Sequence, residues 1–484
     1  MNYKMVFHML GIVLLCLAAL MLLPLVAGLC FGESVVSFLV AIGVAGAAGG
    51  ALVMIKPENT RIYAREGFSI VSLAWILMSL IGALPFVISG DIPNYIDALF
   101  ETVSGFTTTG ATIVESPEAF TKGGMFWRLF THWIGGMGVL VFVMAILPMS
   151  GEHSTHIMRA EVPGPVVGKL VPRAKESSAK LYIIYFGLTV LLCVLLKCGG
   201  MSFYESLLYA FATAGTGGFG TRTGSIAAYN SVYFEMILSI FMLLFSVNFT
   251  LYFLMLQKRF KEALGNEEMH CFFIIVVGAT LAIALGLIRT YGVGNAFRHA
   301  FFNVSTIIST TGYGTEDFTQ WPEYTQWILL SLMLVGGCAG GTAGGMKLSR
   351  VLILFKAVKA DIAQMIHPRS VNIVRLENKK VEDSTVKAVQ TFFAVYILII
   401  IFCGILVSFD GNGLATSATA SIACISNIGP GMDKVGPMGS YNVFSYFSKL
   451  VLTAEMLMGR LEIYPLLILF SRGTITKTRK SKTK

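Results

Sequence analysis

Four short segments rich in threonine and glycine are the part of this chain whose residue types and spacing could do chemistry. They lie at 107–112, 216–221, 310–315 and 426–431. Backbone carbonyl oxygens can replace the water around an ion, and carbonyls that all point inward need partly left-handed backbone angles, which glycine adopts with little strain. Threonine adds a hydroxyl oxygen. These loops therefore predict a ring of oxygen atoms that holds a dehydrated cation.

The four loops can be aligned on one glycine each. The aligned residues are Gly110, Gly218, Gly312 and Gly429, and loops two and three match at five of six positions if Phe and Tyr are equated. The third loop also resembles the filter of tetrameric potassium channels. A single loop of this kind could be an ordinary tight turn, but self-similarity at a long period predicts repeated units around one axis. The fourth loop carries Pro430 and no threonine beside its glycine, so the predicted filter is only pseudo-fourfold.

The elements that must hold these loops are membrane spans. The chain is 55% hydrophobic and only 13% charged, about half the charged fraction of a soluble domain. Runs of about 20 apolar residues can cross a bilayer. Ten are predicted, at roughly 5–31, 35–55, 67–89, 126–149, 180–198, 231–257, 270–290, 326–355, 388–409 and 442–470. Four shorter stretches, which each precede one Thr/Gly loop and are predicted to be re-entrant helices, lie near 94–106, 203–214, 295–309 and 412–425.

Lysine and arginine set the predicted orientation. With a cytoplasmic amino terminus and ten alternating spans, 27 of the 36 Lys and Arg residues fall on the cytoplasmic side and six on the outer side. This bias follows the positive-inside rule, so both termini are expected in the cytoplasm and all four re-entrant stretches outside. It also explains the net charge of +9 without nucleic-acid binding. The basic segment 347–387 and the basic tail could contact membrane lipids or a regulatory partner, and the sequence leaves both open.

The predicted fold is an all-α integral membrane protein. Four pseudo-symmetric units surround one pore, and each consists of a span, a re-entrant helix, a filter loop and a second span. Residues 1–66 form two additional amino-terminal transmembrane helices. The four pore repeats are predicted at 67–178, 179–265, 266–383 and 384–484, the third with a broken gating helix and the fourth with the cytoplasmic tail.

A glycine cluster in the eighth apolar run predicts a break in its helix. Its members are Gly336, Gly337, Gly340, Gly341, Gly344 and Gly345, and Lys347 follows them. Each glycine destabilises a helix by about 1 kcal/mol relative to alanine. We therefore expect an unwound intramembrane loop that gates the exit from the filter. Close helix packing through small residues is the alternative, but this cluster is denser than a packing stripe.

Arg460 lies near the middle of the tenth run, where a charge is expensive and usually functional. We expect this side chain in the pore, as a positive barrier that slows cations. The alternative is a structural ion pair with Glu455 or Glu462. Their separations from Arg460 along the helix are poor for pairing on one face.

Acidic residues near the outer short helices have two interpretations. Asp97, Glu101 and Glu205 could concentrate cations at the pore mouth, or they could form an ordinary solvated rim. The sequence does not choose between these interpretations.

Five motifs carry a resemblance to a known family. They are the segments 104–112, 133–138, 336–345, 427–431 and 459–462. On these residues the chain resembles the Trk/Ktr/HKT superfamily of potassium transporters, from about residue 5 to residue 470, and its two extra amino-terminal spans resemble the Trk branch. The resemblance implies a homodimer with one pore per subunit, uptake of K+ across the bacterial plasma (inner) membrane, no organic cofactor in this chain, and a cytoplasmic TrkA-type nucleotide-binding ring as regulatory partner.

The resemblance also implies which residues hold potassium. In the superfamily these are the two residues before each filter glycine, together with that glycine. Carried over to this chain, they are Thr108, Thr109 and Gly110; Thr216, Gly217 and Gly218; Thr310, Thr311 and Gly312; and Asn427, Ile428 and Gly429. Plant relatives that conduct sodium carry a serine where Gly110 stands here, so glycine at this position is expected to favour potassium.

Two other classes of function were compared with this prediction. An alternating-access carrier of another solute also has many spans and internal repeats, but it would place broken helices and charges at its midplane rather than four loops on one face. An enzyme would need a convergent set of catalytic groups, and the sequence shows none and no phosphate-binding Gly-x-x-x-x-Gly-Lys-Ser/Thr loop. The chain is therefore predicted to be a potassium translocator and not an enzyme. Passive conduction and a Na+/H+-coupled potassium symport both stay open.

Overall fold

Helices make up almost all of the structure, which is a computed structural model that describes residues 2–58, 63–138, 174–369, 373–377 and 379–469. The chain begins with α1 (Tyr3–Leu20), α2 (Leu22–Cys30) and α3 (Val36–Val53). The first loop is flanked by α4 (Ala64–Gly82), α5 (Leu84–Ser89), α6 (Tyr95–Phe106) and α7 (Lys122–Gly136). The second is flanked by α10 (Ala174–Cys198), α11 (Phe203–Gly215), α12 (Val232–Ser246) and α13 (Phe249–Leu256), with α14 (Phe260–Leu264) after them.

The second half of the chain repeats this order. The third loop follows α15 (Glu267–Ile308) and precedes α16 (Glu323–Val335) and α17 (Leu348–Ile366). The fourth lies between α18 (Asp383–Ser408) with α19 (Leu414–Ser426) and α20 (Tyr446–Arg460) with α21 (Tyr464–Leu469). A hairpin of β1 (Arg375–Leu376) and β2 (Lys379–Lys380) is the one departure from all-α structure in the described ranges.

Six helical segments of the described residues are long and apolar enough to cross a membrane, or seven if the bent pair α12–α13 is one span. They correspond to the predicted spans at 5–31, 35–55, 67–89, 180–198, 270–290 and 388–409. Three other predicted spans are not continuous helices. α7 ends at Gly136 and the remainder of its predicted span lies outside the described residues, whereas α16–α17 and α20–α21 are interrupted at 336–347 and 461–463.

The predicted re-entrant stretches are short helices that end at the Thr/Gly loops. α6, α11 and α19 each end within two residues of the predicted boundary. The stretch at 295–309 is the carboxyl-terminal part of α15, which is separated from its spanning part by Gly292 (φ 75°, ψ 167°). The chain therefore reverses direction at Gly292 instead of in a longer loop.

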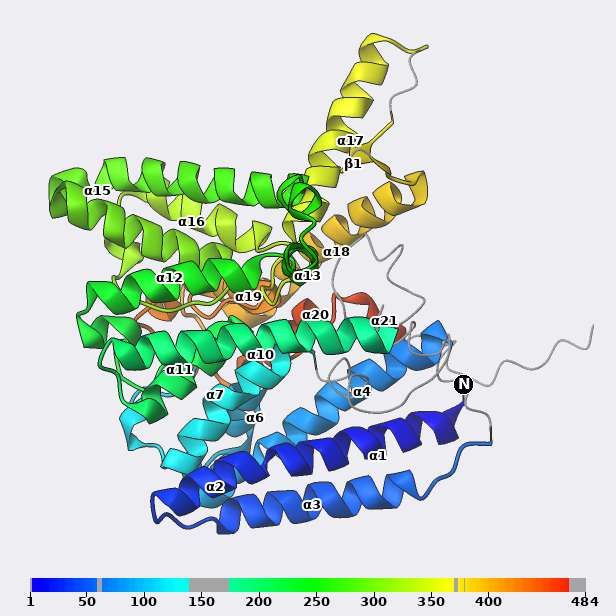
Figure 1. The fold of residues 1–484 in the computed structure, drawn as a ribbon, viewed down its shortest axis with the longest axis vertical. Helices are drawn as coiled ribbons and strands as arrows, with labels where there is room; N and C mark the ends of the chain where they lie inside the picture. The colour runs from blue at the N-terminus through cyan, green and yellow to red at the C-terminus, as the bar shows by residue number, and fades with distance from the viewer. Residues whose placement is uncertain (1, 59–62, 139–173, 370–372, 378, 470–484) are drawn as a thin grey trace, which may run out of the picture.

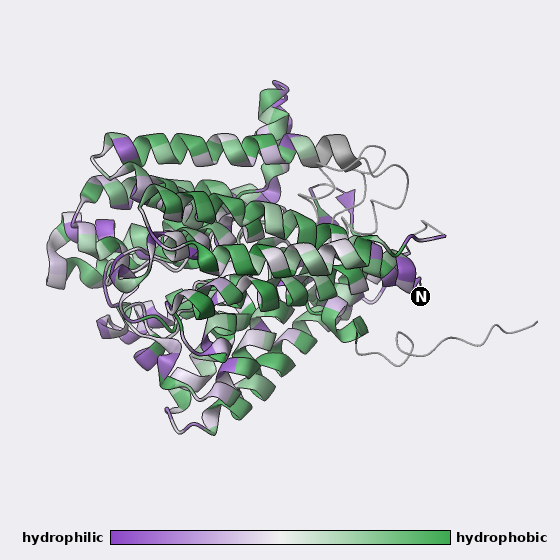
Figure 2. Ribbon diagram, turned by 90° about the horizontal axis from the view of Figure 1, so that it is seen from below, coloured by the Kyte–Doolittle hydropathy of each residue, from purple (hydrophilic) through white to green (hydrophobic). Residues whose placement is uncertain are grey.

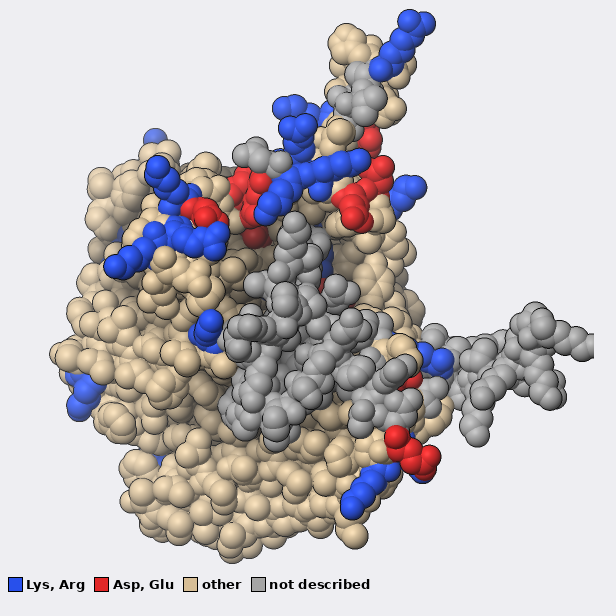
Figure 3. Space-filling view, turned by 45° about the vertical axis from the view of Figure 1, so that its right-hand side comes forward, with Lys and Arg blue, Asp and Glu red and all other residues tan. Residues whose placement is uncertain are grey.

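The long helices run side by side with apolar surfaces facing outward. In Figure 1 the amino terminus, the start of α15 and the protruding α17 lie toward the same end of the helix bundle. Hydrophobic residues cover the long helices (Figure 2), and Ile183, Ile274 and Leu398 are 70%, 71% and 64% exposed. Charged side chains gather over and beside α17 in the upper part of Figure 3. An apolar girdle with charge at one end is the surface expected of a protein that spans a bilayer.

The backbone at Gly292 generates a test of the fold. A Cβ atom at Gly292 or at Gly294 would meet nothing within 4 Å, but only Gly292 has a φ that L residues rarely adopt. We expect Gly292→Ala to destabilise the chain by about 1–3 kcal/mol and Gly294→Ala to be neutral or slightly stabilising. Apparent unfolding temperatures of the two variants in detergent measure the difference. Equal temperatures would contradict the reversal at Gly292.

Candidate ion-conduction site

The four Thr/Gly loops share one backbone turn. The residue two before each aligned glycine is left-handed, with φ of 54° at Thr108, 55° at Thr216, 55° at Thr310 and 53° at Asn427. The next residue donates its N–H to the carbonyl five residues earlier, at 2.9 Å in all four loops: Thr109 to Ser104, Gly217 to Ala212, Thr311 to Thr306 and Ile428 to Ala423. This left-handed end of the short helix satisfies its last carbonyls and turns the chain sharply.

The loops lie against one another in a closed ring. A Cβ built on Gly110 would lie 2.0 Å from the carbonyl oxygen of Gly217 in loop two. A Cβ on Gly218 would lie 2.0 Å from the Thr311 oxygen in loop three. A Cβ on Gly312 would lie 2.8 Å from Cδ of Pro430 in loop four, and a Cβ on Gly429 would lie 2.7 Å from the Gly110 oxygen, back in loop one. The structure therefore brings the four aligned glycines together, and no larger residue fits at the first two without a backbone shift.

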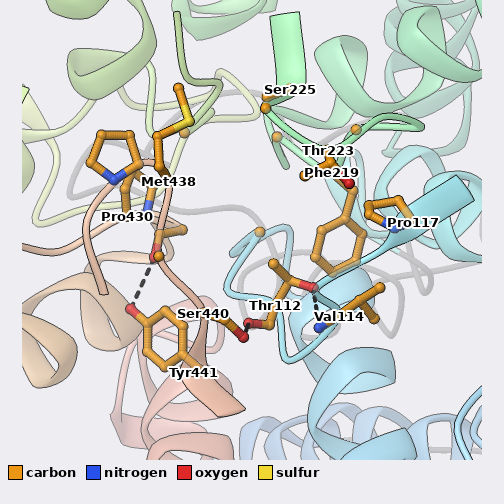
Figure 4. Close-up of a pocket in the computed structure, with 18 of the residues that line it drawn as sticks. Thr112, Val114, Pro117, Phe219, Thr223, Ser225, Pro430, Met438, Ser440 and Tyr441 are labelled. Atoms are coloured by element: carbon orange, nitrogen blue, oxygen red, sulfur yellow. Dashed lines mark hydrogen bonds between the residues drawn. The ribbon is translucent and has the colours of Figure 1, made fainter. Parts of the chain in front are cut away.

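The fourth loop differs from the other three. Gly110, Gly218 and Gly312 have φ of 81°, 76° and 88°, whereas Gly429 lies outside the left-handed region. The carbonyl oxygen of Gly429 accepts a hydrogen bond from the Tyr441 hydroxyl at 2.9 Å (Figure 4). The ring is thus asymmetric at the loop where the sequence lacks threonine.

A cavity of about 320 Å³ opens on the side of the ring formed by residues that follow the glycines. All four aligned glycines line it. Thr112, Phe219 and Pro430 surround it from three of the loops (Figure 4). Glu118 lies beside this mouth; burial opposes its ionisation, but the N–H and hydroxyl of Thr223 donate to its carboxylate and lower the pKa of Glu118. Backbone and side-chain groups of all four loops thus face one solvent-sized space.

A buried ion pair braces loops one and two from behind. The guanidinium of Arg128 on α7 donates to Glu101 at 2.7 Å, and the two side chains are 2% and 0% exposed. The same guanidinium donates to the Gly220 carbonyl at 2.9 Å and to the Thr112 hydroxyl at 3.0 Å. It also lies 3.8 Å from the centre of the Phe219 ring. One side chain therefore holds residues of both loops at fixed positions.

The acidic residues considered for the pore mouth are paired with basic groups. Glu101 is buried against Arg128, so it belongs to neither a solvated rim nor a free cation-concentrating surface. Asp97 accepts from Lys449 at 2.7 Å, and Glu205 accepts from Arg222 at 3.0 Å. The sequence interpretation of these residues was wrong for Glu101, because the positive partner lies 27 positions away on another helix.

The glycine cluster 336–345 is not helical and contacts the third and fourth Thr/Gly loops. It donates the N–H of Gly344 to the Thr310 hydroxyl at 2.6 Å and the N–H of Gly345 to the Ser426 carbonyl at 2.8 Å. Gly336, Gly340 and Gly345 have positive φ, as does Lys347, whose ammonium donates to the Ala343 carbonyl. The cluster contacts residues that precede the aligned glycines, whereas the cavity is lined by residues that follow them.

A second break in the fold receives this cluster. α12 and α13 meet at 90°, at residues 247–248, where sequence analysis predicted a single straight span. The carbonyl of Ser246 accepts from the N–H of Cys338 at 3.1 Å, and the carbonyl of Phe245 accepts from the N–H of Thr342 at 3.0 Å. The two irregular segments thus satisfy each other's backbone groups, which buried backbone requires.

Arg460 joins the glycine cluster to the end of α7. It donates to the Thr342 carbonyl at 3.0 Å, to Gly135 at 2.6 Å and to Gly136 at 2.8 Å. These last carbonyls of α7 are a favourable position for a cation. The two acidic residues considered as its partners bond elsewhere, Glu462 with Arg350 and Glu455 with Ser421.

Comparison with known proteins decides the family. A family model of TrkH cation transport proteins matches residues 37–477. The chain belongs to the TrkH family. The Trk system potassium uptake protein TrkG of Escherichia coli K12 is 34% identical over 97% of this chain and 98% of that protein. TrkH of Halomonas elongata is 32% identical over 97% of this chain and 99% of that protein. The crystal structure of the potassium transporter TrkH from Vibrio parahaemolyticus has a TM-score of 0.88 at 30% identity, covering 98% of this chain and 100% of that chain.

Sequence reasoning missed several residues that position the site of this TrkH-family chain. Arg128 was given no role, although a charge inside an apolar run was a usable signal, and Glu101 was considered only for the pore mouth because its partner is distant in sequence. Tyr441 gave no signal, because one tyrosine among 17 is not distinctive. His132 is fully buried behind the ring and lies within hydrogen-bond distance of the Gly105 carbonyl, at 2.9 Å.

The buried pair generates a test. We expect Arg128→Met alone to cost about 3–5 kcal/mol, because it leaves the Glu101 carboxylate buried without its partner, and Arg128→Met with Glu101→Leu to recover much of that stability. Ion uptake should be impaired in both variants, since the donors to Thr112 and Gly220 are lost. Apparent unfolding temperatures and rubidium influx measure these effects. Lys4→Met, which removes the exposed ion pair between Lys4 and Glu58, is the control. An equal loss of stability in that variant would refute the role of the buried pair in holding loops one and two.

Proposed function

We propose that this chain is the membrane subunit of a potassium uptake system and that it conducts K+ through the ring of four Thr/Gly loops. TrkG of Escherichia coli and TrkH of Halomonas elongata, which match this chain over nearly their whole length, are potassium uptake proteins. The observation that carries the proposal is the closed ring, in which each loop contacts the next and the aligned glycines share one cavity. A ring of backbone oxygens is the ligand set that replaces the hydration shell of potassium.

The proposed potassium ligands are the residues that the superfamily pattern implies. Loops one to three supply oxygen atoms from Thr108–Gly110, Thr216–Gly218 and Thr310–Gly312, and loop four from Asn427–Gly429. The Thr108 hydroxyl supports this role. It is buried and has no hydrogen-bond partner in the part of the chain that the structure describes, and a dehydrated cation would offset the cost of that arrangement.

The glycine cluster and Arg460 are proposed as the gate. The cluster lies across residues that precede the filter glycines, so an ion that leaves the ring away from the cavity meets it first. Arg460 adds a positive charge and three hydrogen bonds that hold the cluster to α7. Opening would require these bonds to break.

We also propose an assembly, a membrane orientation and a regulatory partner for the chain. The chain acts as a homodimer in the bacterial inner membrane, with both termini in the cytoplasm and a cytoplasmic TrkA-type nucleotide-binding ring as regulator. Each of the four predicted repeats contributes one loop to one pore. The basic segments contact that ring or anionic lipid.

Ion flux through Gly110 variants tests the filter. Purified chain in proteoliposomes should take up rubidium, with potassium competing better than sodium. Gly110→Ala places a Cβ 2.0 Å from a backbone oxygen, and we expect uptake to fall at least about tenfold, the factor given by about 1.4 kcal/mol. Gly46→Ala is the control, because a Cβ there meets nothing within 4 Å. Wild-type flux and selectivity in Gly110→Ala would disprove the filter.

The same proteoliposomes distinguish conduction from symport. Uptake that depends on an imposed proton or sodium gradient would favour symport.

Replacing the arginine tests the gate. Arg460→Ala removes the charge and the hydrogen bonds to Thr342, Gly135 and Gly136, each worth about 1.5–3 kcal/mol when charged, and we expect faster rubidium influx. Lys261→Ala on the exposed surface is the control. Unchanged influx together with a lower unfolding temperature would mean that Arg460 is structural and not part of a gate.

A further inference from the structure

Glu268 is a buried carboxylate that neither the filter nor the proposed gate yet uses. It lies in the first turn of α15 and is 5% exposed. A carboxylate at this depth is costly unless hydrogen bonds satisfy it. Its position in the first turn could suggest a helix cap, but Asn266 already caps α15 by accepting from the N–H of Met269 at 2.8 Å.

The partners of Glu268 lie in the glycine cluster and in the helix that follows it. One oxygen atom, Oε1, accepts from the N–H of Ala339 at 2.8 Å and from the N–H of Ser349 at 2.9 Å. Ala339 lies inside the cluster, and Ser349 lies in the first turn of α17, directly after it. A single carboxylate therefore connects the inside of the cluster to the start of α17, the helix that follows it.

We propose that Glu268 is a latch that positions the glycine cluster: its carboxylate holds Ala339 and Ser349 together and keeps the cluster across the ion path. The latch rests on the proposed function, in which the cluster is the gate. Hydrogen bonds from backbone N–H groups to an ionised carboxylate oxygen are stronger than hydrogen bonds between neutral groups. A further hydrogen bond joins the same two segments, since the N–H of Leu348 donates to the Gly337 carbonyl at 3.0 Å.

The residue next to the latch connects it to the surface. Glu267 forms an ion pair with Lys356 on α17 and accepts from the backbone N–H of Glu377, in the turn of the β1–β2 hairpin, at 3.2 Å. Glu377 also accepts a hydrogen bond from Asn266. The first turn of α15 thus contacts the glycine cluster through one carboxylate and α17 with its hairpin through the next. A displacement of α17 would pull directly on Ser349 and on the latch.

Native Cys338 allows the latch to be measured apart from ion flow. Its thiol lies in the glycine cluster and is 1% exposed, and Cys424 in α19 is buried at 0% as an internal reference. The full-length chain is treated with N-ethylmaleimide in proteoliposomes, and mass spectrometry gives the labelling rate at each cysteine. Rubidium influx is measured on the same samples.

Two variants of Glu268 distinguish the loss of its hydrogen bonds from the loss of its charge, and a third variant controls for a general effect on folding. Glu268→Leu removes both acceptors, and we expect labelling of Cys338 to rise at least about tenfold with Cys424 unchanged, the factor that loss of a charged hydrogen bond gives. Glu268→Gln keeps an acceptor oxygen and should lie between wild type and Glu268→Leu. Glu262→Leu, which removes an exposed carboxylate paired with Arg259, is the control and should match wild type.

The outcomes distinguish the latch from the proposed gate. Faster labelling of Cys338 with faster influx supports both. Faster labelling with unchanged influx supports the latch and refutes the gate. Unchanged labelling of Cys338 in both Glu268 variants, or equal increases at Cys338 and Cys424 in both, would overturn the latch.

Discussion

Backbone groups at membrane depth must find partners inside the protein, and this constraint organises the whole structure. The chain leaves helical geometry in four filter loops, in the glycine cluster and at the α12–α13 bend. Several of these segments satisfy one another: the glycine cluster donates to Thr310 and Ser426 in loops three and four, and also to the Phe245 and Ser246 carbonyls at the bend. The irregular segments are therefore gathered at the centre, and the continuous helices surround them with apolar surface (Figures 1 and 2).

Charges follow the same constraint. Two arginines at the centre show this: the buried Arg128 is paired with the Glu101 carboxylate, and the half-buried Arg460 donates to the last carbonyls of α7. Both arginines connect elements that are distant in sequence, so they fix the relative positions of segments that a helix alone could not position. Arg128 holds loops one and two from behind. On the other side of the ring, hydrogen bonds hold the glycine cluster, and the gate proposed above requires these bonds to break.

Much of this arrangement could be predicted from local sequence. Hydropathy predicted six of the ten spans as the continuous helices that the described residues form, and the glycine-rich composition predicted the loops and the interruption at 336–347, because backbone preferences are local properties. No proline or glycine marks the bend at residues 247–248, and its local signal is Asn248, which caps α13 by accepting from the N–H of Thr250 at 2.9 Å. The prediction of a single span did not use that signal, and the contacts of the bend with the glycine cluster exist only in the folded chain. Glu101 was misread for a similar reason: its partner Arg128 is adjacent only in the folded chain. Contacts between segments that are distant in sequence contribute to both features, and local composition does not contain them.

The most direct test of the central claim is an experimental electron-density map of the chain in rubidium, whose anomalous scattering locates the ion. The account predicts peaks on one line among Gly110, Gly218, Gly312 and Gly429, within the contact distance of backbone oxygens from at least three loops. Rubidium found only at the surface, or an empty ring with ions bound elsewhere in the membrane region, would contradict it.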